Sequence, residues 1–141
     1  MITRAGTALV GRLAAAWTAY YRSLYKGAKP TDLRHYTRDL AANLRQPGRL
    51  AALRGMLAGG HAAAAARLGE VRCPALIVMG TADPDFPDPV AEARWLQQQL
   101  AASGNDVVVE LLDGCGHYPI AEAPEPTGKA VLAFLDRTHR A

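Results

Sequence analysis

The sequence predicts an α/β protein in which an all-helical segment precedes two parallel strands with flanking helices. Two short apolar runs, residues 75–80 and 107–112, are rich in β-branched side chains, as buried strands of parallel sheets are. Between and after these runs, apolar residues recur at helical spacing. At 141 residues the chain fits one domain. We divide it into a helical segment, 1–68, and a strand-helix-strand-helix part, 69–141.

Four helices and no strand are expected in the first segment. Apolar residues share one helix face over residues 9–24, and similar faces recur over 31–44 and 50–57. The fourth helix, 61–68, is rich in alanine, the strongest helix former. Glycine and proline residues, which interrupt helices, separate the four: Gly27, Pro30, Pro47, Gly48, Gly59 and Gly60.

The second part begins with a strand that ends at Gly80. Pro74 stands at its first position, where proline is tolerated, and residues 75–79 are all apolar. Because no polar residue alternates with the apolar ones, we expect both faces of this strand to be buried. After a polar loop, Asp88 caps a helix that begins with Pro89 and runs to about residue 103.

The second strand, 107–112, follows the breaker Gly104-Asn105. A polar loop comes next, and Pro126 opens the last helix. Val131, Phe134 and Leu135 fall on one side of that helix, which we expect to face a core.

Polar residues follow both strands, where open α/β sheets carry their active sites. A strand-helix-strand unit makes parallel strands that end at the same edge of the sheet, about 4.8 Å apart. Asp83, Asp85 and Asp88 follow the first strand, and His117 follows the second. We therefore expect a carboxylate of the first loop to lie within hydrogen-bonding reach of the His117 imidazole.

These residues resemble the C-terminal half of an α/β-hydrolase. The resemblance rests on residues 71–83, which end in Gly80-Thr81-Ala82-Asp83, on residues 114–119, which contain Gly116-His117, and on residues 122–135. In that family a strand ending in Gly-x-x-Asp supplies the acid of a catalytic triad, and a later strand followed by Gly-His supplies the base. The likeness covers about residues 70–137, and residues 1–68 resemble the family's helical lid.

The resemblance implies a role for each of two residues. His117 would be the general base and then the general acid, while Asp83 would orient the imidazole and stabilise its charged form. Asp85, two positions later, is the rival acid. Asp83 has the better family spacing from Gly80, and Asp88 is expected to cap a helix instead.

A nucleophile is the part of the family's triad that this sequence lacks. The family carries it upstream on a Gly-x-Ser-x-Gly turn, and Ser23 and Ser103, the two serines here, have no such glycines around them. The resemblance implies a truncated hydrolase whose parent cleaves a small-molecule ester, lactone, epoxide or similar electrophile through a covalent intermediate. It implies no metal and no organic cofactor, and we expect the isolated chain to be inactive.

The two cysteines, Cys73 and Cys115, are too few for a disulfide scaffold, which favours a reducing, cytoplasmic location. Cys115 lies two residues before His117, but a nucleophile and a base in one tight loop rarely face each other. We expect Cys115 to be a small buried side chain instead. The cysteines and His117 match no zinc-site spacing.

Charge is distributed unevenly along the chain. Residues 1–72 carry 12 lysines and arginines against 3 acidic residues, whereas residues 73–141 carry 4 against 10. The basic half leaves open an alternative function, a non-catalytic helical protein that binds nucleic acid. Its basic residues are spread singly along helices, so we favour two halves that attract each other and expect no nucleic-acid partner. No stretch approaches the roughly 20 apolar residues of a membrane span, so no membrane partner is expected.

The edge of strand 75–80 that faces away from strand 107–112 is expected to be unpaired, because the family's preceding strand is missing. An apolar, unpaired edge invites another chain to pair with it. We expect self-association or a complementary N-terminal fragment, unless the helices of residues 1–68 fold over the edge. Aromatic side chains line a pocket under the lid or belong to the core: Trp17, Tyr20, Tyr21, Tyr25 and Tyr118.

Overall fold

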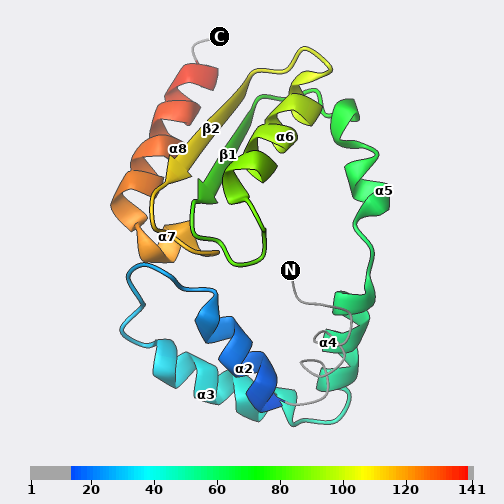
Figure 1. The fold of residues 1–141 in the computed structure, drawn as a ribbon, viewed down its shortest axis with the longest axis vertical. Helices are drawn as coiled ribbons and strands as arrows, with labels where there is room; N and C mark the ends of the chain where they lie inside the picture. The colour runs from blue at the N-terminus through cyan, green and yellow to red at the C-terminus, as the bar shows by residue number, and fades with distance from the viewer. Residues whose placement is uncertain (1–13, 140–141) are drawn as a thin grey trace.

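The computed structural model describes residues 14–139, in which a two-stranded parallel sheet lies between helices (Figure 1). In chain order the elements are α2 (Ala14–Ser23), α3 (Leu33–Leu44), α4 (Arg49–Ala58), α5 (Ala62–Ala65), the 3-10 turn η1 (Leu68–Glu70), β1 (Ala75–Gly80), α6 (Pro89–Ala101), β2 (Val107–Leu112), α7 (Pro119–Glu122) and α8 (Pro124–His139). The expected order, helices first and then strand-helix-strand-helix, is confirmed.

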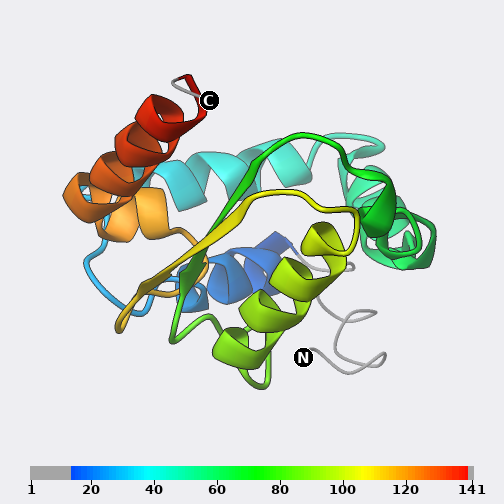
Figure 2. The same cartoon turned by 90° about the horizontal axis from the view of Figure 1, so that it is seen from above.

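The strands pair in parallel with a simple register, from Ala75 opposite Val107 to Gly80 opposite Leu112. Helix α6 connects them, and α6 and α8 cover opposite faces of the sheet (Figure 2). Asp88 caps α6 as expected, because its Oδ1 accepts a hydrogen bond from the backbone N–H of Ala91 at 2.9 Å. Both strands consequently end at the edge of the sheet where their polar loops begin.

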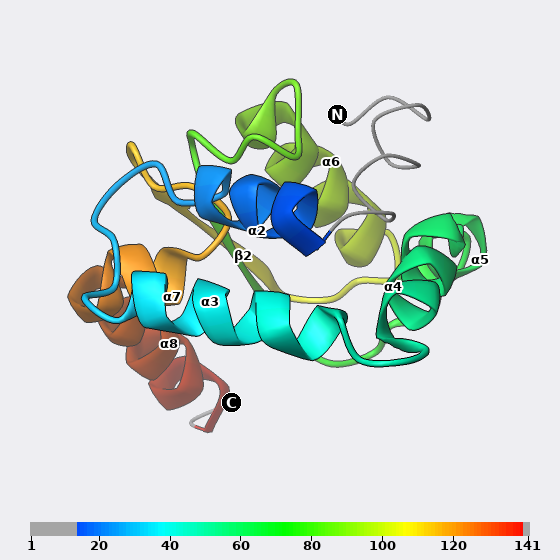
Figure 3. The same cartoon turned by 90° about the horizontal axis from the view of Figure 1, so that it is seen from below.

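The helical segment has its own apolar core. Helices α2 and α3 lie side by side (Figure 3), and Ala14, Leu44 and Leu53 are buried between α2, α3 and α4. The expected first helix is present from residue 14 onward, and its positions 9–13 lie outside the described residues. This core lies apart from the polar loops of the sheet, so it holds the helices together without building the site.

The fourth expected helix is much shorter than predicted. Residues 61–68 were expected to be helical throughout, but α5 covers Ala62–Ala65 alone. All of its residues are exposed, and a short helix without tertiary packing is not stable by propensity alone. The prediction failed because alanine content measures propensity and does not measure burial.

The expected burial of β1 on both faces was wrong for most of the strand. Met79 and Gly80 are buried, while residues 75–78 are only half-buried. Among residues 14–139 no further strand pairs with either edge of the sheet. An open pocket of about 200 Å³ lies between part of the sheet and α8 and is lined in part by Leu76, Val108 and Phe134. The sheet of the described residues is therefore too narrow to bury its own strands.

The last helix also departs from the prediction. It starts at Pro124 rather than Pro126, and the short helix α7 precedes it. Phe134 faces the sheet, but Val131 and Leu135, which we expected in a core, are 37% and 43% exposed. No element of residues 14–139 covers that side of α8. None of the helices in the described part of the chain is long and apolar enough to cross a membrane.

Gly80 marks the closest approach of the two polar loops. A Cβ at this position would overlap the carbonyl oxygens of Cys115 and Gly116, which belong to backbone and cannot move aside like a flexible side chain. Two hydrogen bonds join the loops there, from Thr81 N to the Leu112 oxygen at 3.0 Å and from Ala82 N to the Cys115 oxygen at 2.9 Å.

We predict that Gly80→Ala lowers the free energy of unfolding by about 3 kcal/mol, because the added methyl group must push the loops apart. Urea unfolding followed by circular dichroism measures the change. Gly55→Ala, inside α4 with open space around its Cβ, is the matched control and should gain about 0.5–1 kcal/mol from helix propensity. Equal stabilities for Gly80→Ala and the wild type would contradict the close approach.

Candidate active site

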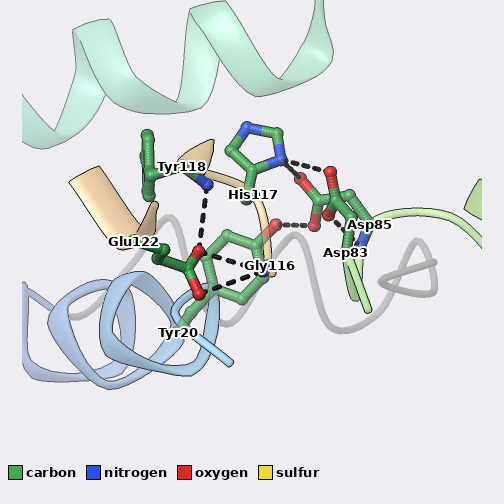
Figure 4. A network of polar contacts seen from close by, with 7 residues as sticks. All are labelled: Tyr20, Asp83, Asp85, Gly116, His117, Tyr118 and Glu122. Carbon is green, nitrogen blue, oxygen red and sulfur yellow. Dashed lines mark hydrogen bonds and ion pairs between the residues drawn. The ribbon is translucent and has the colours of Figure 1, made fainter. Parts of the chain in front are cut away.

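The loops that follow β1 and β2 bring Asp83 and His117 together, as the sequence predicted (Figure 4). The distance between Asp83 Oδ2 and His117 Nδ1 is 2.9 Å, which is a hydrogen bond across 34 positions of sequence. Asp83 is 5% exposed, whereas the His117 side chain is 36% exposed. A buried acid thus faces one nitrogen of a histidine whose ring reaches the surface.

Hydrogen bonds to both its side chain and its backbone hold Asp83 in place. Its Oδ1 accepts a hydrogen bond from the backbone N–H of Asp85 at 2.9 Å, so Oδ2 is left for the imidazole. Its backbone N–H donates to the Gly80 oxygen at 3.2 Å. These contacts fix the carboxylate in one orientation, which an acid that orients a histidine requires.

Asp85 also lies beside the imidazole. The distance from its Oδ2 to His117 Nδ1 is 3.5 Å, longer than the distance for Asp83. Its Oδ1 accepts a hydrogen bond from the Tyr20 hydroxyl of helix α2. Burial raises the pKa of Tyr20, and the hydrogen bond to Asp85 and the charge of Asp85 raise it further. Tyr20 therefore stays protonated and donates.

The other ring nitrogen of His117, Nε2, has no hydrogen-bond partner among residues 14–139. Pairing of Nδ1 with a carboxylate favours the tautomer whose proton is on Nδ1, which leaves a lone pair on Nε2. The Tyr118 ring stands edge-on to the imidazole at 5.0 Å, and the His117 backbone N–H donates to the Leu24 oxygen at 2.9 Å. The geometry suits a base that accepts a proton at Nε2.

Glu122 anchors the loop that carries His117. The residue is 6% exposed. Its carboxylate accepts backbone hydrogen bonds from Lys26 at 2.9 Å, from Gly27 at 2.6 Å, from Gly116 at 3.0 Å and from Tyr118 at 3.3 Å. Burial acts to raise its pKa, but these four N–H groups outweigh burial and lower the pKa from its ordinary value of 4.5. Glu122 is therefore ionised at neutral pH and joins the α2–α3 connection to the histidine loop.

Gly116 makes this junction possible. A Cβ there would overlap the Leu24 oxygen and would also press on Lys26 N and Glu122 Oε1. The Gly-His pair of the sequence thus has a steric reason, because the α2–α3 connection crosses directly over the residue before His117.

In a comparison with known families, the Alpha/beta hydrolase family matches residues 2–130. The chain belongs to the α/β-hydrolase family. Its fold is similar to a solved structure described as a membrane phospholipase A, a bacterial virulence factor, with a TM-score of 0.67 and 20% identity. That alignment covers 94% of this chain and 41% of the phospholipase chain. No curated protein matches the sequence.

Neither serine of this α/β-hydrolase chain lies on a strand-to-helix turn of the kind that carries the family's nucleophile. The Ser23 hydroxyl donates to the Tyr20 oxygen of its own helix at 2.7 Å. The Ser103 hydroxyl donates to the Val71 oxygen at 2.7 Å, near the start of β1 and at the edge of the sheet opposite His117. Neither serine faces the imidazole.

Cys115 is 6% exposed, as expected of a small buried side chain, and Cys73 is exposed. Burial, followed by the negative charge of Glu122, raises the pKa of the Cys115 thiol. The thiol therefore remains protonated, and a protonated thiol is a poor nucleophile.

Among residues 14–139, a group of side chains close enough to offer ligands to a cation is found in the site itself. One atom each from Asp83, Asp85 and His117 lies within 4.8 Å of the other two. His117 Nδ1 already binds Asp83, so a cation there would replace the contact that orients the imidazole.

The aromatic residues form a cluster beside the histidine loop. The rings of Tyr21 and Tyr118 are 5.4 Å apart, and those of Tyr25 and Tyr118 are 5.0 Å apart. Tyr25 is buried at 7% exposure, while Tyr36, which packs on Tyr21, is 48% exposed. Tyr25 therefore belongs to the buried core, whereas Tyr36 lies at the surface of the protein.

We predict that Glu122→Gln destabilises the fold by about 2–3 kcal/mol at pH 7, because hydrogen bonds to a charged acceptor are lost and one amide end cannot accept. Thermal or urea unfolding measures the change. The exposed Glu125→Gln is the matched control and should stay within about 0.5 kcal/mol.

The difference in stability between the wild type and Glu122→Gln should depend on pH. The pKa of Glu122 is lower in the folded chain than in the unfolded one, so its stabilisation is complete above pH 4.5 and is lost as the pH falls through the folded value. The difference in stability between wild type and Glu122→Gln should therefore shrink below pH 4.5. A difference that stays constant into acid would show that Glu122 does not act through its charge.

Proposed function

We propose that this chain supplies the acid and the base of a hydrolase triad, with His117 as the base and Asp83 as the acid that orients it. The observation that supports this most directly is the pairing of Nδ1 with buried Asp83 while Nε2 is open. The proposed parent reaction is hydrolysis of an ester, lactone, epoxide or similar small molecule by a nucleophile, His117 and Asp83.

For an ester or lactone attacked by a hydroxyl or thiol, Nε2 of His117 takes the proton of that nucleophile in the proposed mechanism. The imidazolium that forms is stabilised by the Asp83 carboxylate at Nδ1. His117 then returns the proton to the leaving group, and in a second round activates water to release the covalent intermediate. The sequence has no Gly-x-Ser-x-Gly turn, so the proposal assigns the nucleophile and the oxyanion hole to another polypeptide segment.

The size of the match is in keeping with a partial catalytic unit. The chain spans 41% of the phospholipase structure's chain, and residues 1–68 would serve as the lid over the substrate. For the parent enzyme we propose no narrower substrate class than an ester, lactone, epoxide or similar small electrophile. A reducing, cytoplasmic location stays a prediction.

We predict that the purified chain hydrolyses nitrophenyl acetate no faster than a His117→Ala control, since a base without a nucleophile and an oxyanion hole loses most of the rate gain. When the chain is co-expressed with a segment that supplies the missing strands and nucleophile turn, His117→Ala should reduce turnover by about 10³-fold or more. Activity of the chain alone that His117→Ala abolishes, and that alkylation of both cysteines spares, would contradict the absence of a nucleophile.

A second prediction concerns the free edge of β1. Its backbone groups on the side away from β2 pair with no strand of residues 14–139, and two strands rarely suffice for a stable sheet. We expect the isolated chain to self-associate, or to be soluble only with a complementary N-terminal fragment. Size-exclusion chromatography with light scattering at micromolar concentration tests this. A sharp monomer peak near 15.0 kDa with cooperative thermal unfolding would overturn it.

A further inference from the structure

We propose that Tyr20 and Asp85 form a positioning pair, in which the Tyr20 hydroxyl holds Asp85 as a second carboxylate beside Nδ1 of His117. Helix α2, in the segment compared above with a lid, would then help to orient the imidazole. This inference rests on the proposed role of His117 and adds a second acid and a donor to it.

The first step is electrostatic. Asp83 and Asp85 place carboxylate oxygens within 4.8 Å of each other and of Nδ1, and like charges at this distance repel. Asp83 cannot turn away, because it is buried and its Oδ1 is bound to the Asp85 backbone N–H. Asp85 is 29% exposed, so the repulsion alone would turn its side chain toward water. A further contact must therefore keep the Asp85 carboxylate beside the imidazole.

The second step identifies that contact. The Tyr20 hydroxyl donates to Asp85 Oδ1, so the second oxygen, Oδ2, faces Nδ1 at 3.5 Å (Figure 4). Tyr20 and Asp85 are 65 positions apart, so the contact depends on how α2 sits against the loop. A hydrogen bond to an ionised acceptor is about twice as strong as one between neutral groups.

The third step is the rigidity of the donor. The Tyr20 ring packs against Trp17 at 5.4 Å between ring centroids. The C-terminal end of α2 is joined to the histidine loop by the bond from His117 N to the Leu24 oxygen and by the Glu122 contacts. Tyr20 is thus fixed relative to His117 by backbone contacts that do not involve Asp85.

The pairing has a chemical consequence. When Nε2 accepts a proton, the imidazolium faces two carboxylates rather than one, and the second is held by a group of α2. Asp85 and Tyr20 act through His117, so both are positioning residues.

The test uses side-chain ¹H–¹⁵N spectra of the full 141-residue chain at about pH 9, well above the ordinary histidine pKa of about 6.5. The spectra report which ring nitrogen of His117 carries the proton and how fast the Nδ1 proton exchanges with water. Exposed His61, which has no side-chain hydrogen bond among the described residues, is the internal reference for an unrestrained imidazole.

We expect Tyr20→Phe and Asp85→Asn each to speed exchange of the Nδ1 proton by about fivefold, the equivalent of one net hydrogen bond. The double variant should be no faster than either single one, because the two residues act as a unit. Tyr21→Phe is the matched control on the same helix and should change nothing, since its hydroxyl contacts Tyr25. Unchanged exchange in Tyr20→Phe, or additive effects of the two changes, would overturn the positioning pair.

A second set of variants removes the main acid. In Asp83→Ala we expect His117 to keep its proton on Nδ1, because Asp85 takes over, and in Asp83→Ala with Tyr20→Phe we expect the tautomer ratio of His61. Equal ratios in the two variants would also overturn the inference. A wild-type His117 that already shows the His61 ratio would instead refute the proposed Asp83–His117 pair, so the two failures are distinguishable.

Discussion

The buried carboxylate of Glu122 is the contact on which the site depends. It accepts hydrogen bonds from backbone N–H groups of the α2–α3 connection, at Lys26 and Gly27, and of the histidine loop, at Gly116 and Tyr118. Lys26 and Gly27 lie 96 and 95 positions before Glu122 in the sequence, and each N–H group would be unsatisfied without the carboxylate. A buried charge is costly unless it is fully hydrogen-bonded, so the carboxylate and its donors stabilise one another.

Polar contacts and local packing together position the catalytic candidates. The larger buried apolar cluster lies between α2, α3 and α4, while beside the histidine loop Tyr25 and Tyr118 pack against each other. The close crossing at Gly80 and Gly116 and the hydrogen bonds of Thr81 and Ala82 add to this packing. Asp83 and His117 meet because their loops are tied at these points.

The two oppositely charged halves of the sequence meet in an unexpected way. Within residues 14–139 the ion pairs join residues of the same half, as in Arg67–Glu70 and Arg137–Asp106. Hydrogen bonds from neutral donors connect the halves instead, among them those from backbone N–H groups to Glu122 and from the Tyr20 hydroxyl to Asp85. Hydrogen-bond geometry is directional, so these contacts specify how α2 sits over the site, which diffuse charge attraction cannot do.

The sequence by itself determined the strands, the connecting helix with its Asp88 cap, and the meeting of His117 with a carboxylate of the loop after β1. These follow from local pattern and from one topological rule, because the loops after two adjacent parallel strands must lie at the same edge. The choice of Asp83 over Asp85 came from the spacing that the family resemblance implies. Only the tertiary structure decided the anchoring by Glu122, the contact of Tyr20 with Asp85 and the exposure of β1 and α8. Each of these joins or separates segments far apart in the chain, and neither residue spacing nor helix propensity carries information about such distances.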